Sequence, residues 1–98
     1  MAETVFYILL SLTEPRQGYE IIRFVEDLTE RNVKLGSGTV YGTLTKMQKD
    51  GITTMFTGEQ QKTVYQITSV GKALMRAEMD RVKNLYFNMM SQEDFFND

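Results

Sequence analysis

The chain changes its hydrophobic period at Gly51, and this change constrains the fold more than any other feature. Within 39–50, apolar side chains recur at the i, i+4, i+7 spacing of one helix face. After the glycine, 52–57 alternates like a strand, and 63–67 is again rich in β-branched and aromatic residues. The intervening 58–62 predicts a polar hairpin loop, longer than the minimal turn. We therefore predict a helix followed by two short antiparallel strands.

Three further helices are predicted around this centre. One starts near Glu3 and stops at the Thr13-Glu14-Pro15 stretch. Because it is apolar on nearly every side, it favours contact with a partner subunit, although a core helix or a strand also fits. A second, amphipathic helix begins at Gln17-Gly18 and ends between Thr29 and Asn32. The last opens at Thr68-Ser69 and is expected to reach about Met90, before an acidic tail.

The central helix, Thr39 to Asp50, is expected to expose a polar face. Ser37 or Thr39 is a plausible N-cap after the Gly36-Ser37-Gly38 turn, and Gly51 is a plausible C-terminal cap. At 100° per residue, the face opposite the apolar one carries only small, hydroxylic or cationic side chains. They are Thr39, Gly42, Thr43, Lys46 and Lys49.

The last helix carries a 4-3-4-3 apolar pattern that is typical of a two-helix coiled coil. The pattern consists of Met75, Met79, Val82, Tyr86 and Met89. Leu74, Ala77 and Leu85 lie off this line and could pack on the domain itself. Because the pattern covers only about two heptads, an ordinary amphipathic core helix is nearly as consistent with it. The apolar surplus of the first helix favours dimerisation.

Composition narrows the class of protein. Ninety-eight residues predict one domain, and the chain contains no cysteine and no histidine. Disulfides, thiol chemistry, His/Cys zinc sites and histidine acid–base catalysis are thereby excluded, so we expect no enzyme, metal or cofactor. The longest apolar run, Val5 to Leu12, is too short to span a bilayer and lacks a basic leader. We expect a soluble cytoplasmic protein.

The net charge of −2 hides an uneven distribution along the sequence. Residues 1–30 carry −4, whereas 31–49 carry +4 with no acidic side chain. Residues 50–62 carry −1, 63–90 carry +2 and 91–98 carry −3. The positive stretch coincides with the polar-faced helix and its approach, which favours contact with an anionic partner such as DNA, although a solvated basic face is common.

The predicted order of elements is that of a winged helix-turn-helix domain, mainly α with a two-stranded β-wing. The sequence also resembles PadR-type transcriptional regulators. The resemblance rests on Gly18-Tyr19-Glu20-Ile21-Ile22, Gly38-Thr39-Val40-Tyr41 with Leu44, Gly51-Ile52, and 65–71, Tyr-Gln-Ile-Thr-Ser-Val-Gly. It covers about 5–90 and is closest to the branch with one C-terminal helix. We expect a DNA-binding domain (1–68), a dimerisation helix (69–90) and an acidic tail (91–98).

The resemblance implies a homodimeric repressor that binds an inverted-repeat operator in double-stranded DNA and is released by a small molecule. On this chain the implied DNA-binding residues are Ser37, Thr39, Tyr41, Thr43, Lys46, Lys49, Gln60, Gln61 and Lys62. Gly42 replaces a frequent proline, and Lys62 is the wing's one cation. The implied residues of the dimer interface, and of a pocket for a hydrophobic or aromatic effector, are Phe6, Tyr7, Met75, Met79, Val82, Tyr86 and Met89.

Two alternatives remain open. The residues of the dimer interface could simply fill a core without binding any ligand, particularly because the chain has no tryptophan and Val82 takes the place of the aromatic residue used by drug-binding relatives. The whole domain could also be a winged helix used for protein contact, since folds of this kind host such roles. In that case the net acidity and the weakly cationic wing would reflect a lost DNA function.

Overall fold

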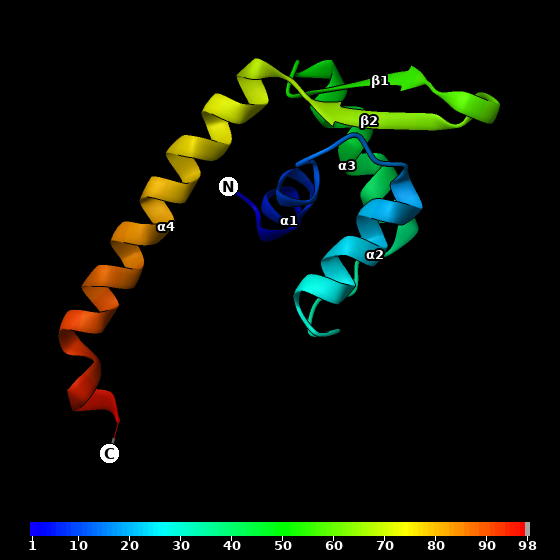
Figure 1. Ribbon diagram of the computed structural model, residues 1–98. Coiled ribbons are helices and arrows are strands. Elements are labelled where there is room, and N and C mark those ends of the chain that lie inside the picture. Colours follow the sequence, from blue (N-terminus) through cyan, green and yellow to red (C-terminus); the bar gives the residue numbers. More distant parts are fainter. Residues whose placement is uncertain (98) are drawn as a thin grey trace.

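The computed structural model describes residues 1–97 and shows the predicted order of helices and strands (Figure 1). The elements are α1 (Glu3–Ser11), α2 (Gly18–Leu28), α3 (Ser37–Lys49), β1 (Thr53–Thr57), the 3-10 turn η1 (Glu59–Gln61), β2 (Thr63–Ile67) and α4 (Ser69–Phe96). The strands pair antiparallel, with Thr53 opposite Ile67 and Thr57 opposite Thr63. The predicted fold class, mainly α with a two-stranded wing, is confirmed.

The hydrophobic core lies where α1, α2 and α3 meet the sheet and the start of α4. Its buried side chains come from every one of these elements: Ile8, Leu9 and Leu12; Ile21; Val40, Leu44 and Met47; Tyr65; and Met75. The apolar face predicted for α3 is thus confirmed. α1 is a core helix, and the alternative of a strand is wrong. Arg16 forms an isolated antiparallel bridge with Tyr65 on β2. The two residues exchange two backbone hydrogen bonds.

The two ends of α3 differ in how well they were predicted. Gly51 follows the helix at φ +75°, and Gly51 N and Ile52 N donate to Gln48 O and Met47 O. This is the Schellman motif, so the predicted C-terminal cap is confirmed. The N-cap is Gly36, with no side-chain cap, and Ser37 is already helical. The prediction that Ser37 or Thr39 caps the helix is therefore wrong, because the helix starts at Ser37, three residues before Val40, the first apolar residue of its pattern.

α4 begins as predicted and ends later than predicted. Thr68 is the N-cap, and its Oγ1 accepts from Gly71 N at 3.1 Å and lies 2.6 Å from the carbonyl oxygen of Gly51. The helix continues to Phe96, so the expected end near Met90 is wrong, and most of the predicted acidic tail is helical. Asp98, the last residue of that tail, lies outside the described residues.

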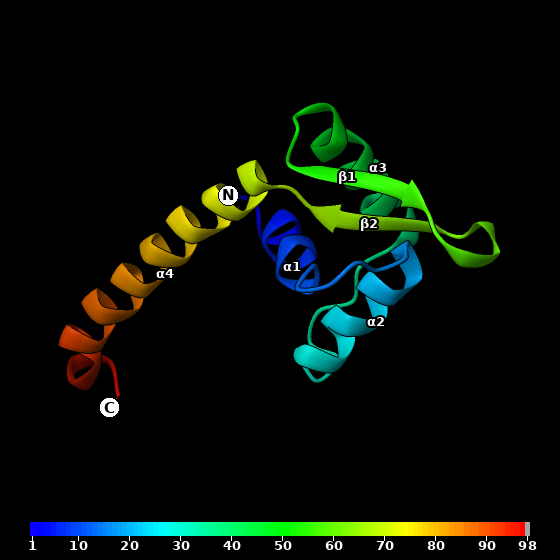
Figure 2. The same ribbon diagram turned by 45° about the horizontal axis from the view of Figure 1, so that its top comes forward.

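Only the first three turns of α4 pack on the domain. Gly71, Met75 and Glu78 are buried there, and every residue from Arg81 to Gln92 is exposed. Leu74, Ala77 and Leu85 are exposed as well, so the prediction that they pack on the domain is wrong. The radius of gyration, 15.6 Å, exceeds the roughly 13 Å of a compact chain of this length because α4 leaves the domain (Figure 2).

Candidate nucleic-acid interface

α3 presents its polar face to solvent. Val40, Leu44 and Met47 are buried on the inner side, whereas the outer side carries exposed Thr39, Gly42, Lys46 and Lys49. Thr43 is half-buried at the edge of this face. The structure therefore brings most of the predicted α3 residues to one surface. Thr45 and Gln48 are also exposed on α3 and were missed, because the prediction followed only the side directly opposite the apolar stripe.

The start of α3 leaves backbone amides free. The first intrahelical hydrogen bond runs from Val40 N to Gly36 O at 3.0 Å, so the amides of Ser37, Gly38 and Thr39 precede it. These N–H groups and the positive end of the helix dipole favour an anion at this point. No acidic side chain lies in the first turn to occupy the position. Ser37 and Gly38 are exposed, which leaves the helix start accessible.

Tyr41 joins α3 to the start of α2. An added Cβ at Gly18 would overlap the Tyr41 ring, so the ring lies directly on the α2 backbone, where a side chain would displace it. Tyr41 remains 45% exposed. Burial raises the pKa of the Tyr65 hydroxyl, and nearby Tyr41 raises it further. Tyr41 thus helps to set the position of α3 against α2, in addition to the phosphate contact that the sequence predicts.

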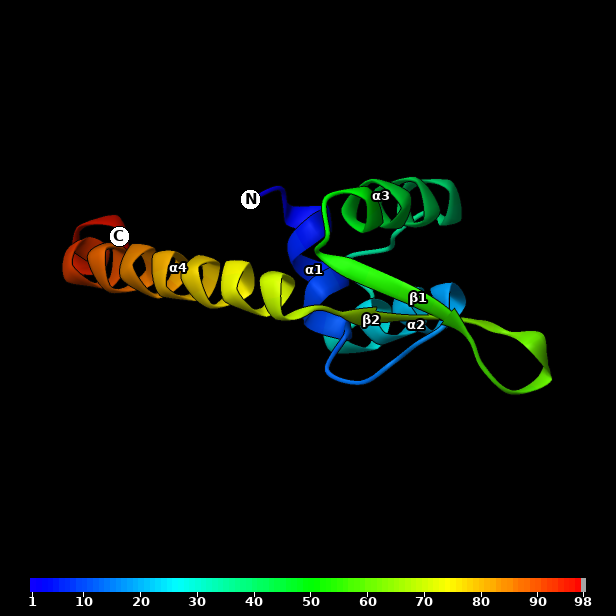
Figure 3. The same ribbon diagram turned by 90° about the horizontal axis from the view of Figure 1, so that it is seen from above.

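The hairpin projects from the same end of the domain as the start of α3, remote from the C-terminal end of α4 (Figure 3). Its tip holds Gln60, Gln61 and Lys62, all exposed as predicted. Gly58 N donates to Lys62 O at 2.7 Å, which closes the loop. Gln60 and Gln61 adopt φ of 58° and 57°, a left-handed conformation that is strained for residues with a side chain. The loop geometry therefore holds both amide side chains at the tip.

Two further exposed cations precede α3 in the chain. Arg31 and Lys34 lie in the exposed connection between α2 and α3 and belong to the +4 segment 31–49. The charge count of the sequence includes both residues, but helix-face reasoning did not select them for the site, because they lie outside α3. Within the described residues neither side chain forms an ion pair.

The residues predicted for dimerisation do not form one pocket within the chain. Met75 is 6% exposed and packs in the core. Met79, Val82, Tyr86 and Met89 are exposed along α4. Phe6 and Tyr7, half-buried on α1, contact each other edge to face with ring centroids 5.8 Å apart.

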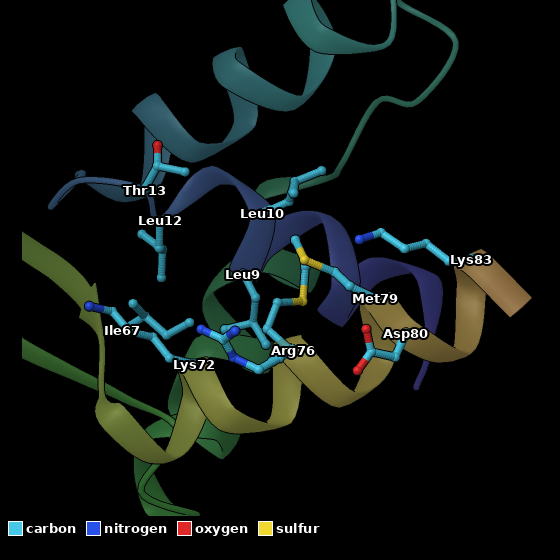
Figure 4. A pocket seen from close by; sticks show the side chains of 11 residues that line it. Leu9, Leu10, Leu12, Thr13, Ile67, Lys72, Arg76, Met79, Asp80 and Lys83 are labelled. Atoms are coloured by element: carbon cyan, nitrogen blue, oxygen red, sulfur yellow. The ribbon is translucent and has the colours of Figure 1, made fainter.

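A hollow of about 400 Å³ opens between α1 and the first half of α4 (Figure 4). Its apolar lining is Leu9, Leu10, Leu12, Ile67, Met75 and Met79. Lys72, Arg76, Asp80 and Lys83 add charged groups along α4, and Thr13 closes the α1 side. Of the predicted pocket residues, only Met75 and Met79 line it. The sequence could not place this hollow, because it depends on the angle between α1 and α4.

A buried carboxylate links α4 to the chain start. Glu78 is 8% exposed, accepts from Arg81 Nε at 2.9 Å, and lies 3.6 Å from the Met1 ammonium. The hydrogen bond from Arg81 is the main reason that the pKa of Glu78 is lowered, although burial opposes it. The same pair raises the pKa of Arg81. This contact holds the third turn of α4 against the N-terminal segment.

Residues 1–97 contain no cluster of three or more His, Cys, Asp or Glu side chains that could hold a metal ion. Nor is any helix in that range long and apolar enough to cross a membrane.

Comparison with known proteins supports a common fold. A PadR family transcription regulator from hypervirulent Clostridium difficile R20291 matches with a TM-score of 0.77 and 21% identity, over 92% of this chain and 97% of that chain. A transcriptional regulator from Clostridium thermocellum matches at 0.77 and 19%, over 90% and 86%. Bacillus subtilis PadR, solved in complex with operator DNA, matches at 0.67 and 20%, over 78% of this chain and 45% of its own.

No curated protein matches the chain. The profile of the family described as "Transcriptional regulator PadR-like family" matches residues 6–77, which is most of the sequence. That stretch includes α3, the hairpin and the start of α4. The chain belongs to the PadR-like family of transcriptional regulators, which are not enzymes.

Proposed function

We propose that the chain is a cytoplasmic, homodimeric repressor that binds an inverted-repeat operator and is released by a small hydrophobic or aromatic molecule. The observation that carries the DNA-binding part is the exposed hydroxyl and amine face of α3, a helix whose N-terminal end lies toward the hairpin (Figure 3). Such a helix fits the DNA major groove while the wing follows the adjacent backbone. The operator complex of the Bacillus subtilis relative supports this proposal.

The polar groups suggest a division of roles on DNA. Thr39, Thr43 and Lys46 are the candidates for base edges or phosphates, because hydroxyls and amines can donate to both. Lys49 and Tyr41 would contact phosphates beside them, and Ser37 would serve a phosphate at the helix start. Gln60, Gln61 and Lys62 would contact the backbone from the wing. With one cation at the tip, binding is expected to release few counterions there.

Dimerisation is supported by the apolar surface that α4 exposes. Five large apolar side chains along one projecting helix are 39% to 55% exposed, more than scattered surface residues explain: Val82, Leu85, Tyr86, Met89 and Met90. Two such helices bury this surface by pairing. Val82→Asp should dissociate the dimer in sedimentation equilibrium, because it places an unpaired charge in the contact. A variant that remains dimeric would show that the contact lies elsewhere.

The effector site is proposed at the same interface, where Phe6, Tyr7, Met79, Tyr86 and Met89 offer aromatic and thioether surface. Planar aromatic compounds should release the protein from its operator. The measurement is fluorescence anisotropy of labelled DNA, titrated with such compounds against wild type and Met89→Ala. Equal release of DNA from wild type and Met89→Ala would show that Met89 does not belong to the effector site.

DNA binding is tested with a labelled fragment of the gene's own promoter region. Thr39→Ala and Lys46→Ala should each weaken binding, and Lys46→Ala should reduce the salt slope by about one unit if the amine contacts a phosphate. Arg23→Ala on α2, an exposed arginine near the carboxylates of Glu20 and Asp27, is the matched control. Unchanged binding by both α3 variants would refute the assignment of α3 as the recognition helix. A wild-type chain with no affinity for DNA would favour the protein-contact alternative.

A further inference from the structure

Hydrogen bonds among Gly51, Ile52 and Thr68 tie the end of α3 to the start of α4, and we call these three residues the joint. We propose that Thr68 is a positioning residue whose hydroxyl fixes the angle between α3 and α4, and that this angle selects the spacing between the two half-sites of an operator. The inference rests on the proposed homodimeric DNA-binding function, because only a dimer reads a spacing.

On the α3 side, the joint moves with the end of the helix. Gly51 N donates to Gln48 O at 3.1 Å, and Ile52 N donates to Met47 O at 2.9 Å. Ile52 N belongs to the same peptide unit as Gly51 O, so that carbonyl oxygen is held directly by the last turn of α3. A shift of α3 therefore carries the Gly51 oxygen with it.

On the α4 side, Thr68 contributes both its backbone and its side chain. Its N–H donates to Ile52 O at 3.0 Å, and its Oγ1 accepts from Gly71 N at 3.1 Å as the N-cap of α4. The hydroxyl donates to Gly51 O at 2.6 Å, with Ile52 O also in reach at 2.9 Å. Thr68 Oγ1 thus joins the first turn of α4 to a peptide unit that α3 holds.

A close contact at Gly71 makes the joint a pivot. An added Cβ there would overlap Ile52 O, so the first turn of α4 lies directly on the start of the hairpin. A contact at one point fixes a distance but leaves the tilt of the helix free. The hydrogen bond from Thr68 Oγ1 to Gly51 O supplies a second point on the side of α3, whereas α4 packs chiefly on α1 and β2. This hydroxyl therefore sets the tilt of α4 relative to α3.

The length of α4 amplifies a change of tilt. Val82, in the surface proposed for dimerisation, lies about 16 Å along the helix from Gly71 (Figure 2). A tilt of about 6° displaces that point by about 1.7 Å, and in a symmetric dimer the two subunits together change the separation of their α3 helices by about 3.4 Å. This is the rise of one base pair, so a joint that holds its angle defines one spacing.

Three substitutions separate the two roles of the Thr68 hydroxyl. Thr68→Ser keeps the donor to Gly51 O and the acceptor for Gly71 N. Thr68→Asp keeps the acceptor and a good N-cap, but its ionised carboxylate cannot donate and repels the Gly51 oxygen. Thr68→Val loses both. Thr54→Val, at an exposed position of β1, is the control for loss of a threonine hydroxyl from the hairpin.

The DNA readout is the spacing that each full-length variant selects from randomised duplexes of about 30 base pairs. Wild type, Thr68→Ser and Thr54→Val should select one spacing, by about tenfold or more over spacings one base pair longer or shorter. Thr68→Asp should select the same half-site sequence but shift the spacing, or accept neighbouring spacings within about threefold. A mere loss of stability weakens binding to every spacing alike and does not move this readout.

A second readout needs no DNA. The chain has no cysteine, so Thr45→Cys on the exposed side of α3 gives one spin-label site in each subunit. Pulsed dipolar spectroscopy then measures the distance between the two α3 helices of the dimer. Thr68→Asp and Thr68→Val should shift this distance by about 3 Å or broaden its distribution by as much, whereas Thr68→Ser should leave it unchanged.

The outcomes separate this inference from the proposed function. Thr68→Asp with the wild-type spacing and the wild-type spin-label distance would overturn the role of the joint and leave the proposed function standing, as would an equal change in Thr68→Ser. A wild-type chain that selects no inverted repeat, or that gives no distance between subunits, refutes the proposed function, and the inference with it.

Discussion

Replacing Gly71 with alanine tests how closely α4 is packed against the hairpin. An added Cβ would overlap the carbonyl oxygen of Ile52 and lie 2.7 Å from Cγ1 of Ile67. That oxygen is held in place, because it accepts from Thr68 N at 3.0 Å and lies 2.9 Å from Thr68 Oγ1. Backbone must therefore move, and overpacking of this kind costs about 1–3 kcal/mol. The better helix propensity of alanine offsets less than about 1 kcal/mol of this.

The net expectation for Gly71→Ala is a loss of about 1–2 kcal/mol, or a fall in Tm of about 4–16 °C for a domain of this size. Gly42→Ala is the control, because Gly42 is also helical and a Cβ there meets nothing within 4 Å. It should raise Tm by up to about 8 °C through propensity alone. Thermal unfolding followed by circular dichroism, at one protein concentration, gives both values. A Gly71→Ala variant as stable as Gly42→Ala would refute the reasoning.

Three further predictions concern stability. Glu30→Gly should stabilise the chain by about 0.5–1 kcal/mol in urea unfolding, because residue 30 follows α2 at φ 52°, where glycine is unstrained; no gain would show that the strain is absent. Thr53→Val should add about 1 kcal/mol, since Thr53 Oγ1 is buried with no hydrogen-bond partner among the described residues; a loss would reveal an ordered water there. The pKa of Glu78 is lowered from 4.5, so its contribution is present above that pH and is lost as pH falls through the folded-state pKa. Urea midpoints from pH 6 to 3 should drop less steeply for Glu78→Gln than for wild type, and equal slopes would contradict this role.

Features that depend on a few neighbouring residues were predicted well. The change of period at Gly51, the C-terminal cap at that glycine and the start of the last helix at Thr68-Ser69 all follow from local backbone preferences, and all are confirmed. The inner and outer sides of α3 also follow from its period, because Val40 and Leu44 have only one core to face. These features locate most of the candidate DNA-binding surface, although exposed Thr45 and Gln48 on α3 were not predicted.

Only the tertiary structure decided how much of α4 packs on the domain. Its apolar pattern is continuous from Met75 to Met89. Periodicity alone cannot show where along the helix such a stripe stops packing on its own domain. The direction in which α4 departs from the domain buries Met75 and Glu78, exposes Val82 and Met89, and opens the hollow beside α1. The sequence determined the elements and their faces through short-range backbone preferences and periodicity. The tertiary structure decided which part of each face is covered, because that depends on the angles at which helices pack.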